Sequence, residues 1–112
     1  MKKVYAKNKK AKFDYEILKT FEAGISLLGI EVKSIQLSKV SLKESYISCV
    51  DNQIKWKQGH ISLLSSKDGF TKVDENRDRV LLLNKNEIKE IREAISQDGC
   101  TCVPLELYKE NY

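Results

Sequence analysis

Histidine is almost absent from this chain, in which His60 is the only one among 112 residues. In "QGHIS" it falls within or just after a predicted strand, where a structural or surface histidine is far commoner than a catalytic one. A catalytic cysteine-histidine pair would combine His60 with Cys49, Cys100 or Cys102. Each cysteine, however, lies in a strand pattern typical of core packing, so we do not expect nucleophilic catalysis.

Cysteine is scarce as well, and its count of three is odd. Cys100 and Cys102 are too close to bridge easily within one strand, so we expect reduced thiols in a cytosolic protein. The same stretch has no second cysteine pair or nearby histidine, which argues against a zinc site. The sequence has no glycine-rich phosphate-binding loop of either standard spacing, G-x-G-x-x-G or G-x-x-x-x-G-K-S/T. We therefore predict no enzyme activity, no metal and no cofactor.

Long apolar runs are also missing: none approaches the roughly 20 residues that a membrane span needs. The basic opening "MKKVYAKNKKAKFDY" is not followed by the apolar stretch of a secretory signal. We expect no membrane partner and a cytoplasmic location. With 41% hydrophobic and 32% charged residues, the composition is that of a globular protein. The length fits one domain, which we expect to be a monomer and to bury a core without disulfides.

The net charge of +4 is modest, but it is unevenly distributed. No acidic residue precedes Asp14. The lysines that crowd the start are Lys2, Lys3, Lys7, Lys9, Lys10 and Lys12. We predict that residues 1–12 form a basic arm and that residues 13–112 form the single domain. Charge alone slightly favours a solvated tail over a segment that binds a polyanion. In the second case, each lysine would release counterions from the polyanion on binding.

Hydrophobic spacing predicts a strand and then a helix in the first third of the chain. Residues 13–22 alternate apolar and polar side chains, as in a strand with one mostly apolar face. Leu28, Val32 and Ile35 recur at helical spacing and predict a helix that ends near Ser38.

The middle of the chain predicts a hairpin followed by a loop. Residues 41–50 and 53–64 are two β-patterned runs joined at Asp51-Asn52, a good hairpin turn. Residues 65–80 have no periodicity and many charges, so we predict an exposed loop. Its length in a compact domain suggests a binding loop.

The clearest predicted element is a helix after Asn84, which forms a capping-box pattern with Glu87 and stops at Gly99. Its expected buried stripe is Ile88, Ile91 and Ile95. Residues 100–112 then alternate like a strand, in which Pro104 argues for an edge or a bulge. Mostly antiparallel strands with two or three helices predict a mainly β fold, and a small barrel rather than a sandwich.

Six stretches, taken in order, resemble one known family. They are "NKKAKFDYEI", "FEAGISLLGIEVKSI", "KVSLKESYI", "HIS" at 60–62, "RDRVLLLNKNEI" and "GCTCVPLELYK". The second is the most characteristic, with Glu-Ala-Gly followed by Gly-x-Glu-Val-Lys-Ser. One such stretch would be a weak signal. Six in register make the chain similar, over nearly all of its length, to the SsrA-binding proteins, also called small protein B.

The resemblance implies an antiparallel oligonucleotide-binding-type barrel with flanking helices. It implies binding without catalysis. Members of this family bind the tRNA-like domain of transfer-messenger RNA and bring it to stalled ribosomes, with contacts to the 30S and 50S subunits, for trans-translation and peptide tagging. The alternative that the residues leave open is a general single-stranded nucleic-acid-binding barrel. That function needs several exposed aromatic side chains along one groove, and the candidates are Tyr46, Trp56 and Phe70.

The resemblance also implies an RNA site around Glu22. A carboxylate cannot contact phosphate favourably, so it would accept hydrogen bonds from base edges or hold a cation in place. Leu82 and Asn84 would form a second contact cluster, Tyr15 could stack on a base, and Lys33 could neutralise a phosphate. The remaining predicted RNA-binding residues are Lys7, Lys9, Lys10, Lys12, Arg77 and Arg79.

Each of these residues also has a structural interpretation. Glu22 could be a solvated strand-end carboxylate, and Leu82 and Tyr15 could be core. Asn84 is a good helix cap and could serve both roles, because capping needs only its side-chain oxygen. Glu31, early in the predicted helix, is most simply structural and is not placed in the site.

The sequence departs from the family at several positions. Phe13 stands where many relatives carry histidine, Gln36 where arginine is usual and Val80 where lysine is usual, so two phosphate contacts are expected to be missing. The family continues past "LYKENY" with a further strand and a lysine-rich tail that enters the mRNA channel. We expect a chain without them to keep RNA recognition in weaker form and to lose tagging. We also expect the strand around Leu105 and Leu107 to present an unpaired edge that lowers stability and promotes self-association.

Overall fold

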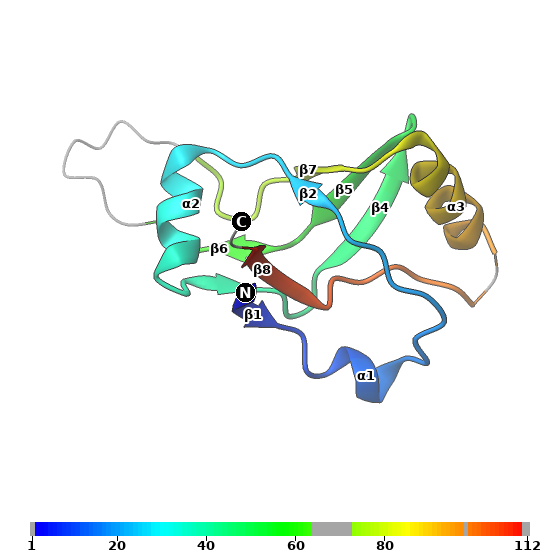
Figure 1. Cartoon of the computed structure of the whole chain (residues 1–112), viewed down its shortest axis with the longest axis horizontal. Helices are drawn as coiled ribbons and strands as arrows, with labels where there is room; N and C mark the ends of the chain where they lie inside the picture. The colour runs from blue at the N-terminus through cyan, green and yellow to red at the C-terminus, as the bar shows by residue number, and fades with distance from the viewer. Residues whose placement is uncertain (1, 64–72, 98, 111–112) are drawn as a thin grey trace.

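The computed structural model of this chain describes residues 2–63, 73–97 and 99–110 (Figure 1). In chain order the elements are β1 (Lys2–Lys7), α1 (Ala11–Asp14), β2 (Gly24–Ile25), α2 (Gly29–Gln36), β3 (Val40–Ser41), β4 (Tyr46–Val50), β5 (Gln53–Lys57), β6 (His60–Ile61), β7 (Arg79–Leu82), α3 (Lys85–Ile95) and β8 (Glu106–Glu110). A mainly β fold with flanking helices is therefore confirmed.

All the strand pairings are antiparallel, and they join the described strands into three sheets. The largest has the order β2-β7-β5-β4, and the other two are the pairs β1-β8 and β3-β6. The predicted antiparallel barrel therefore corresponds, in the described residues, to separate sheets around one core rather than to a continuous closed ladder.

The predicted hairpin is β4 and β5. Asp51 and Asn52 both have positive φ, 51° and 61°, as the two central residues of a type I′ turn require. Ile47 of β4, with Ile54 and Trp56 of β5, points into the core. Trp56 packs so closely on Gly59 that a Cβ at residue 59 would lie 2.0 Å from the indole ring.

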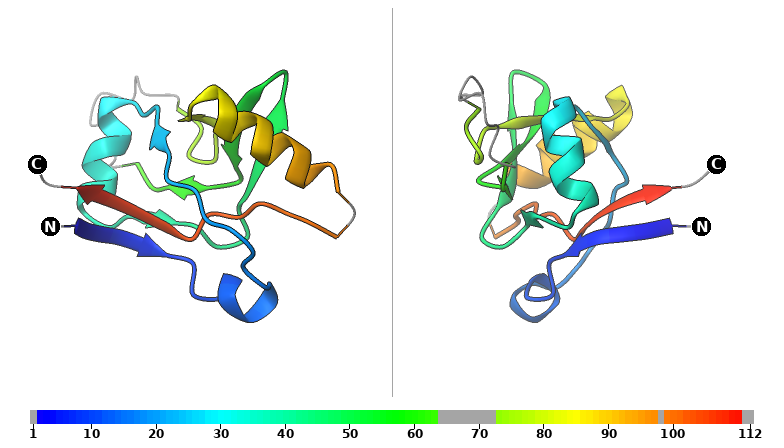
Figure 2. Two further views of the ribbon diagram at one scale, coloured as in Figure 1. Left: turned by 45° about the vertical axis from the view of Figure 1, so that its right-hand side comes forward. Right: turned by 90° about the vertical axis from the view of Figure 1, so that its left-hand side faces the viewer.

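Helices close the core from two sides (Figures 1 and 2). Ile35 of α2 and Ile91 of α3 are both buried against the hairpin residues. Ile88 and Ile95 of α3 are partly buried against the same cluster, which confirms the predicted stripe. The predicted capping box is also present at the start of α3.

The lysine-rich start is not a free tail. Lys2–Lys7 form β1, which pairs antiparallel with β8, and the two strands lie side by side in Figures 1 and 2. The Asn8 N–H extends this pairing by donating to the Leu105 carbonyl at 2.8 Å. The prediction of a solvated tail is therefore wrong for residues 2–7, and one edge of the last strand does have a partner.

Three other element predictions need correction. Residues 13–22 are not a strand: Phe13 lies in α1, and residues 15–23 are outside any helix or strand. The last strand begins at Glu106, after Pro104, rather than at residue 100. Of the predicted loop 65–80, residues 65–72 lie outside the described residues, and Arg79 and Val80 belong to β7.

Candidate nucleic-acid interface

The β2–β7 pairing brings the two predicted contact clusters together. Gly24 of β2 pairs with Leu82 of β7, and Ile25 pairs with Leu81. Glu22 lies two residues before Gly24, and Asn84 lies two residues after Leu82. The residues singled out in "FEAG" and in "LLLN" therefore belong to one edge of the fold, although they are far apart in the chain.

Leu82 is not core, because 59% of its surface is exposed. Its partner Gly24 contributes to this exposure: a Cβ there would lie 3.3 Å from the Leu82 Cβ, so any side chain would crowd it. An exposed leucine beside a bare backbone offers a flat apolar surface. Such a surface suits the face of a base or a ribose.

Asn84 is exposed and caps α3. Its Oδ1 accepts the Glu87 N–H at 2.8 Å, and the Asn84 N–H donates to the Glu87 carboxylate at 3.1 Å. Capping uses the side-chain oxygen only, so the amide NH₂ group is available as a donor to RNA.

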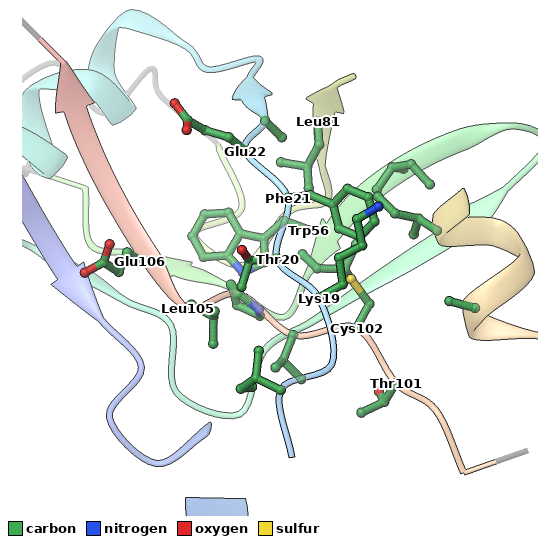
Figure 3. A pocket seen from close by; sticks show the side chains of 18 of the residues that line it. Lys19, Thr20, Phe21, Glu22, Trp56, Leu81, Thr101, Cys102, Leu105 and Glu106 are labelled. Carbon is green, nitrogen blue, oxygen red and sulfur yellow. The ribbon is translucent and has the colours of Figure 1, made fainter. Parts of the chain in front are cut away.

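Glu22 lies on the irregular segment 15–23 and is exposed. This segment forms one wall of a cavity of about 830 Å³ whose other wall includes Trp56 and Leu81. Figure 3 shows the Glu22 carboxylate directed away from the Trp56 ring. Tyr108 of β8 lines the same cavity, and the nearby Glu22 carboxylate, together with burial and the charges of Glu110 and Glu106, raises the pKa of Tyr108 to about 12.

The predicted lysines are exposed and belong to different elements. Lys9, Lys10 and Lys12 are exposed on and around α1, and Lys33 is exposed on α2. Lys7 has a side chain that is 57% exposed and lies 4.0 Å from Glu106. Tyr15 is 45% exposed, so its structural interpretation as core is wrong.

Arg79 must be withdrawn from the predicted RNA contacts, because it has no exposed surface. Its Nε donates to Glu31 at 2.9 Å, Nη1 to the Gly59 carbonyl at 2.7 Å and Nη2 to the Glu75 carbonyl at 2.8 Å. The guanidinium is fully used within the fold and cannot reach a phosphate.

Arg77 is partly exposed but engaged with the same carboxylate. Its Nε donates to the Glu31 Oε2 at 3.0 Å, and its side chain is 29% exposed. Glu31 itself is completely buried, and its Oε1 also accepts the Leu28 N–H at 2.9 Å. Burial alone would raise the pKa of Glu31, but the hydrogen bonds from Arg77, Leu28 and Arg79 outweigh it and hold the pKa below its ordinary value. The structural interpretation of Glu31 is confirmed, with Arg77 and Arg79 as its partners.

His60 is held by its neighbours, as expected for a structural histidine. Its Nδ1 lies 2.7 Å from the Asn76 Oδ1 and its Nε2 lies 3.0 Å from the Ser62 Oγ. In the described part of the chain, no three histidine, cysteine, aspartate or glutamate side chains are grouped as metal ligands. No helix there is long and apolar enough to cross a membrane.

The family model described as SmpB protein matches residues 5–112 of this chain. The chain belongs to the SmpB family. It is 48% identical to the SsrA-binding protein of Ruthia magnifica subsp. Calyptogena magnifica over 105 residues, which cover 94% of this chain and 64% of that protein. It is 44% identical to the SsrA-binding protein of Bdellovibrio bacteriovorus over 104 residues, or 93% of this chain and 68% of that one. The chain thus spans about two thirds of the length of these relatives.

A solved structure of an SmpB-family chain has a similar fold. It is described as "tmRNA-SmpB: a journey to the center of the bacterial ribosome", with a TM-score of 0.75 and 38% sequence identity. The match covers 93% of this chain and 72% of the other. The resemblance inferred from six short stretches is therefore confirmed at the level of the family.

Two residues that line the cavity together with Glu22 were missed in the sequence, namely Tyr108 and Lys2. Lys2 was noted only as part of a basic arm, and Tyr108 only as part of a final strand. Nothing local in the sequence marks them, because their place in this cavity depends on the pairing of β1 with β8, which are far apart in the chain.

Proposed function

We propose that this chain is an RNA-binding adaptor that binds the tRNA-like domain of transfer-messenger RNA and brings it to stalled ribosomes for trans-translation. The proposal rests on one observation above all: β2 pairs with β7 so that Gly24, two residues after Glu22, lies opposite the exposed Leu82, two residues before Asn84. It is supported by the names of the similar proteins, which are SsrA-binding proteins.

The chemistry of this edge suits folded RNA. The Glu22 carboxylate accepts hydrogen bonds from amino and imino groups, which bases have and phosphates lack. The Asn84 amide offers donors, and Leu82 offers an apolar surface for an unstacked base. Lys9, Lys10 and Lys12 add charge for the backbone, and Tyr15 and Lys33 stay in the proposal as secondary contacts.

The chain acts in this proposal by binding, without catalysis, as a cytoplasmic monomer whose further partners are the 30S and 50S ribosomal subunits. The alternative of a general single-strand-binding barrel is weakened by Trp56, which is only 2% exposed and cannot act as a stacking platform. Tyr46 is 42% exposed, and Phe70 lies outside the described residues.

A binding comparison tests the proposal. The tRNA-like domain of transfer-messenger RNA and an unstructured RNA of equal length are titrated with the protein at several salt concentrations. We expect a preference of more than about tenfold for the folded RNA. A smaller preference would favour the general single-strand-binding function.

Glu22→Ala should weaken binding to the tRNA-like domain by about 1–3 kcal/mol, the range for a lost base-edge contact. The dependence of affinity on salt should stay almost unchanged, because no phosphate contact is removed. The matched control is Glu93→Ala, which removes an exposed carboxylate near the other end of α3. If Glu22→Ala binds as tightly as this control while the fold is intact, the base-reading role is wrong.

A further inference from the structure

The segment that carries Glu22 is attached to the fold on both sides of this residue. On one side, Gly24 pairs with Leu82 of β7. On the other side, the Lys19 Nζ donates to both carboxylate oxygens of Glu90 on α3, at 2.6 Å and 2.7 Å. Both attachments are therefore made to the part of the chain that runs from β7 into α3 and holds the other candidate contacts.

Side chains of this segment point to opposite sides of its backbone. In Figure 3, Lys19 and Phe21 lie on one side, whereas Glu22 lies on the other. The Lys19 Nζ also lies 5.1 Å from the centre of the Phe21 ring, and that ring packs against the core. The contacts of Lys19 and Phe21 therefore determine the side of the segment on which the Glu22 carboxylate is displayed.

This attachment matters because the segment has no regular structure of its own. Residues 15–23 lie outside any helix or strand, so no ladder of hydrogen bonds fixes the backbone there. Ordering an exposed glutamate on such a segment during RNA binding costs conformational entropy. A contact that orders the segment beforehand removes part of that cost.

We propose that Lys19 and Glu90 are positioning residues: their ion pair holds the Glu22 segment against α3, so that the Glu22 carboxylate is placed for RNA before binding. The inference rests on the proposed function, because it assigns the pair a part in RNA recognition that acts through Glu22. Lys19 and Glu90 themselves bind each other and make no contact with RNA.

The exposure of the pair sets the size of the effect. The Lys19 and Glu90 side chains are 58% and 50% exposed, so their pairing contributes little to the stability of the whole fold. The apparent affinity for RNA scales with the fraction of molecules in which Glu22 is correctly placed. Loss of a surface pair should lower that fraction, and with it the affinity, by about two- to fivefold.

The sign of one substitution separates positioning from simple charge. Glu90→Ala removes a negative charge, which on electrostatic grounds alone would strengthen binding to RNA. It also breaks the ion pair, so we expect binding to the tRNA-like domain to weaken about two- to fivefold. The matched control Glu93→Ala removes the same charge three residues further along α3 and should bind at least as tightly as the parent. If Glu90→Ala binds like this control, the proposal is overturned.

Exchange of the two charges tests the ion pair itself. Lys19→Glu alone places two carboxylates together and should weaken RNA binding. The double variant with Lys19→Glu and Glu90→Lys re-forms the pair at the same net charge, so its affinity should return to within about twofold of the parent. A double variant that binds as weakly as Lys19→Glu alone would show that Lys19 acts on RNA directly, and this result overturns the proposal.

A double-mutant cycle tests whether the pair acts through Glu22. In the Glu22→Ala background, Glu90→Ala should cause no further loss of affinity for the tRNA-like domain, because no carboxylate remains to be placed. Fully additive losses would contradict the proposal, since the pair would then act independently of Glu22. Urea midpoints of all variants exclude a loss of fold as the cause.

The restraint is also tested without RNA. Backbone ¹⁵N relaxation should give residues 19–23 of the parent order parameters near those of a rigid backbone, about 0.85, and lower values in Glu90→Ala. Equal order parameters in the two proteins would overturn the positioning role. A parent protein that binds folded and unstructured RNA equally would instead overturn the proposed function. The relaxation measurement, which uses no RNA, would still decide whether the pair restrains the segment, so the two failures are distinguishable.

Discussion

Glu31 is a carboxylate with no exposed surface, which the fold stabilises with two arginines. It is fully buried, and it accepts hydrogen bonds from both Arg77 and Arg79, of which Arg79 is also fully buried. Removal of one partner from such a cluster leaves the other charge buried without compensation. The cluster ties α2 to β7, the strand that ends at Leu82.

Glu31→Ala should therefore lower the free energy of unfolding by about 3–5 kcal/mol, measured by urea denaturation. The matched control is Glu90→Ala, which breaks the pair between Lys19 and Glu90. That pair has a distance of 2.6 Å, but its side chains are 58% and 50% exposed. Its loss should cost about 1 kcal/mol or less. Equal effects of the two substitutions would contradict the assigned role of Glu31.

The same carboxylate should make stability depend on pH. Its pKa in the folded protein lies below the ordinary value, so the stabilisation is present above the unfolded pKa of about 4.3 and is lost as pH falls through the folded pKa. Urea midpoints measured between pH 6 and pH 3 should fall more steeply for the parent than for Glu31→Gln. Parallel curves would show that Glu31 does not contribute.

Among the elements, the start of α3 and the β4–β5 hairpin were predicted in place, because their signals are local, whereas α3 ends at Ile95 rather than at the predicted Gly99. A capping box, a helical stripe of isoleucines and a turn pair with positive φ all act within a few residues. Residues 13–22 show the limit of this reasoning. Their alternation is real, but a strand also needs a neighbour with which to pair, and the described chain gives this segment none.

Asn84 serves α3 as its cap and is proposed to serve RNA as a donor, and two substitutions separate these roles. Asn84→Ala should lower stability by about 1 kcal/mol through loss of the cap. Asn84→Ser keeps a capping oxygen and should be nearly as stable as the parent. Both remove the amide donors, so both should weaken binding to the tRNA-like domain by about 1–3 kcal/mol. Parent-like RNA binding by Asn84→Ser would limit Asn84 to capping.

At the scale of the whole molecule, the exposed lysines near α1 should contribute to the salt dependence of RNA binding. Replacement of Lys9 and Lys10 together by alanine should flatten the slope of log affinity against log salt by up to about two units, if both touch phosphate. The matched control is Lys39→Ala with Lys43→Ala, which removes the same charge from exposed positions between α2 and β4. Equal slopes for the two double variants would exclude a specific role for the lysines near α1.

The features that could not be predicted are those made by distant segments. The residues of the candidate site were named from a family resemblance, but their meeting depends on the β2–β7 register. The burial of Arg79 depends on Glu31, Gly59 and Glu75 from other parts of the chain. No local pattern distinguishes a buried arginine from one that binds phosphate, and this is why Arg79 was assigned to RNA.

The pairing of β1 with β8 has a thermodynamic consequence for ligand binding. It joins segments about a hundred residues apart, so its formation carries a large loop-closure entropy, and contacts of such long range form slowly. Separation of the two strands, which are paired in the closed state, would also take Lys2 and Tyr108 away from the cavity that they line together with Glu22. The apparent affinity for RNA is then the intrinsic affinity scaled by the closed fraction. By linkage, RNA that prefers the closed state also draws the two ends of the chain together.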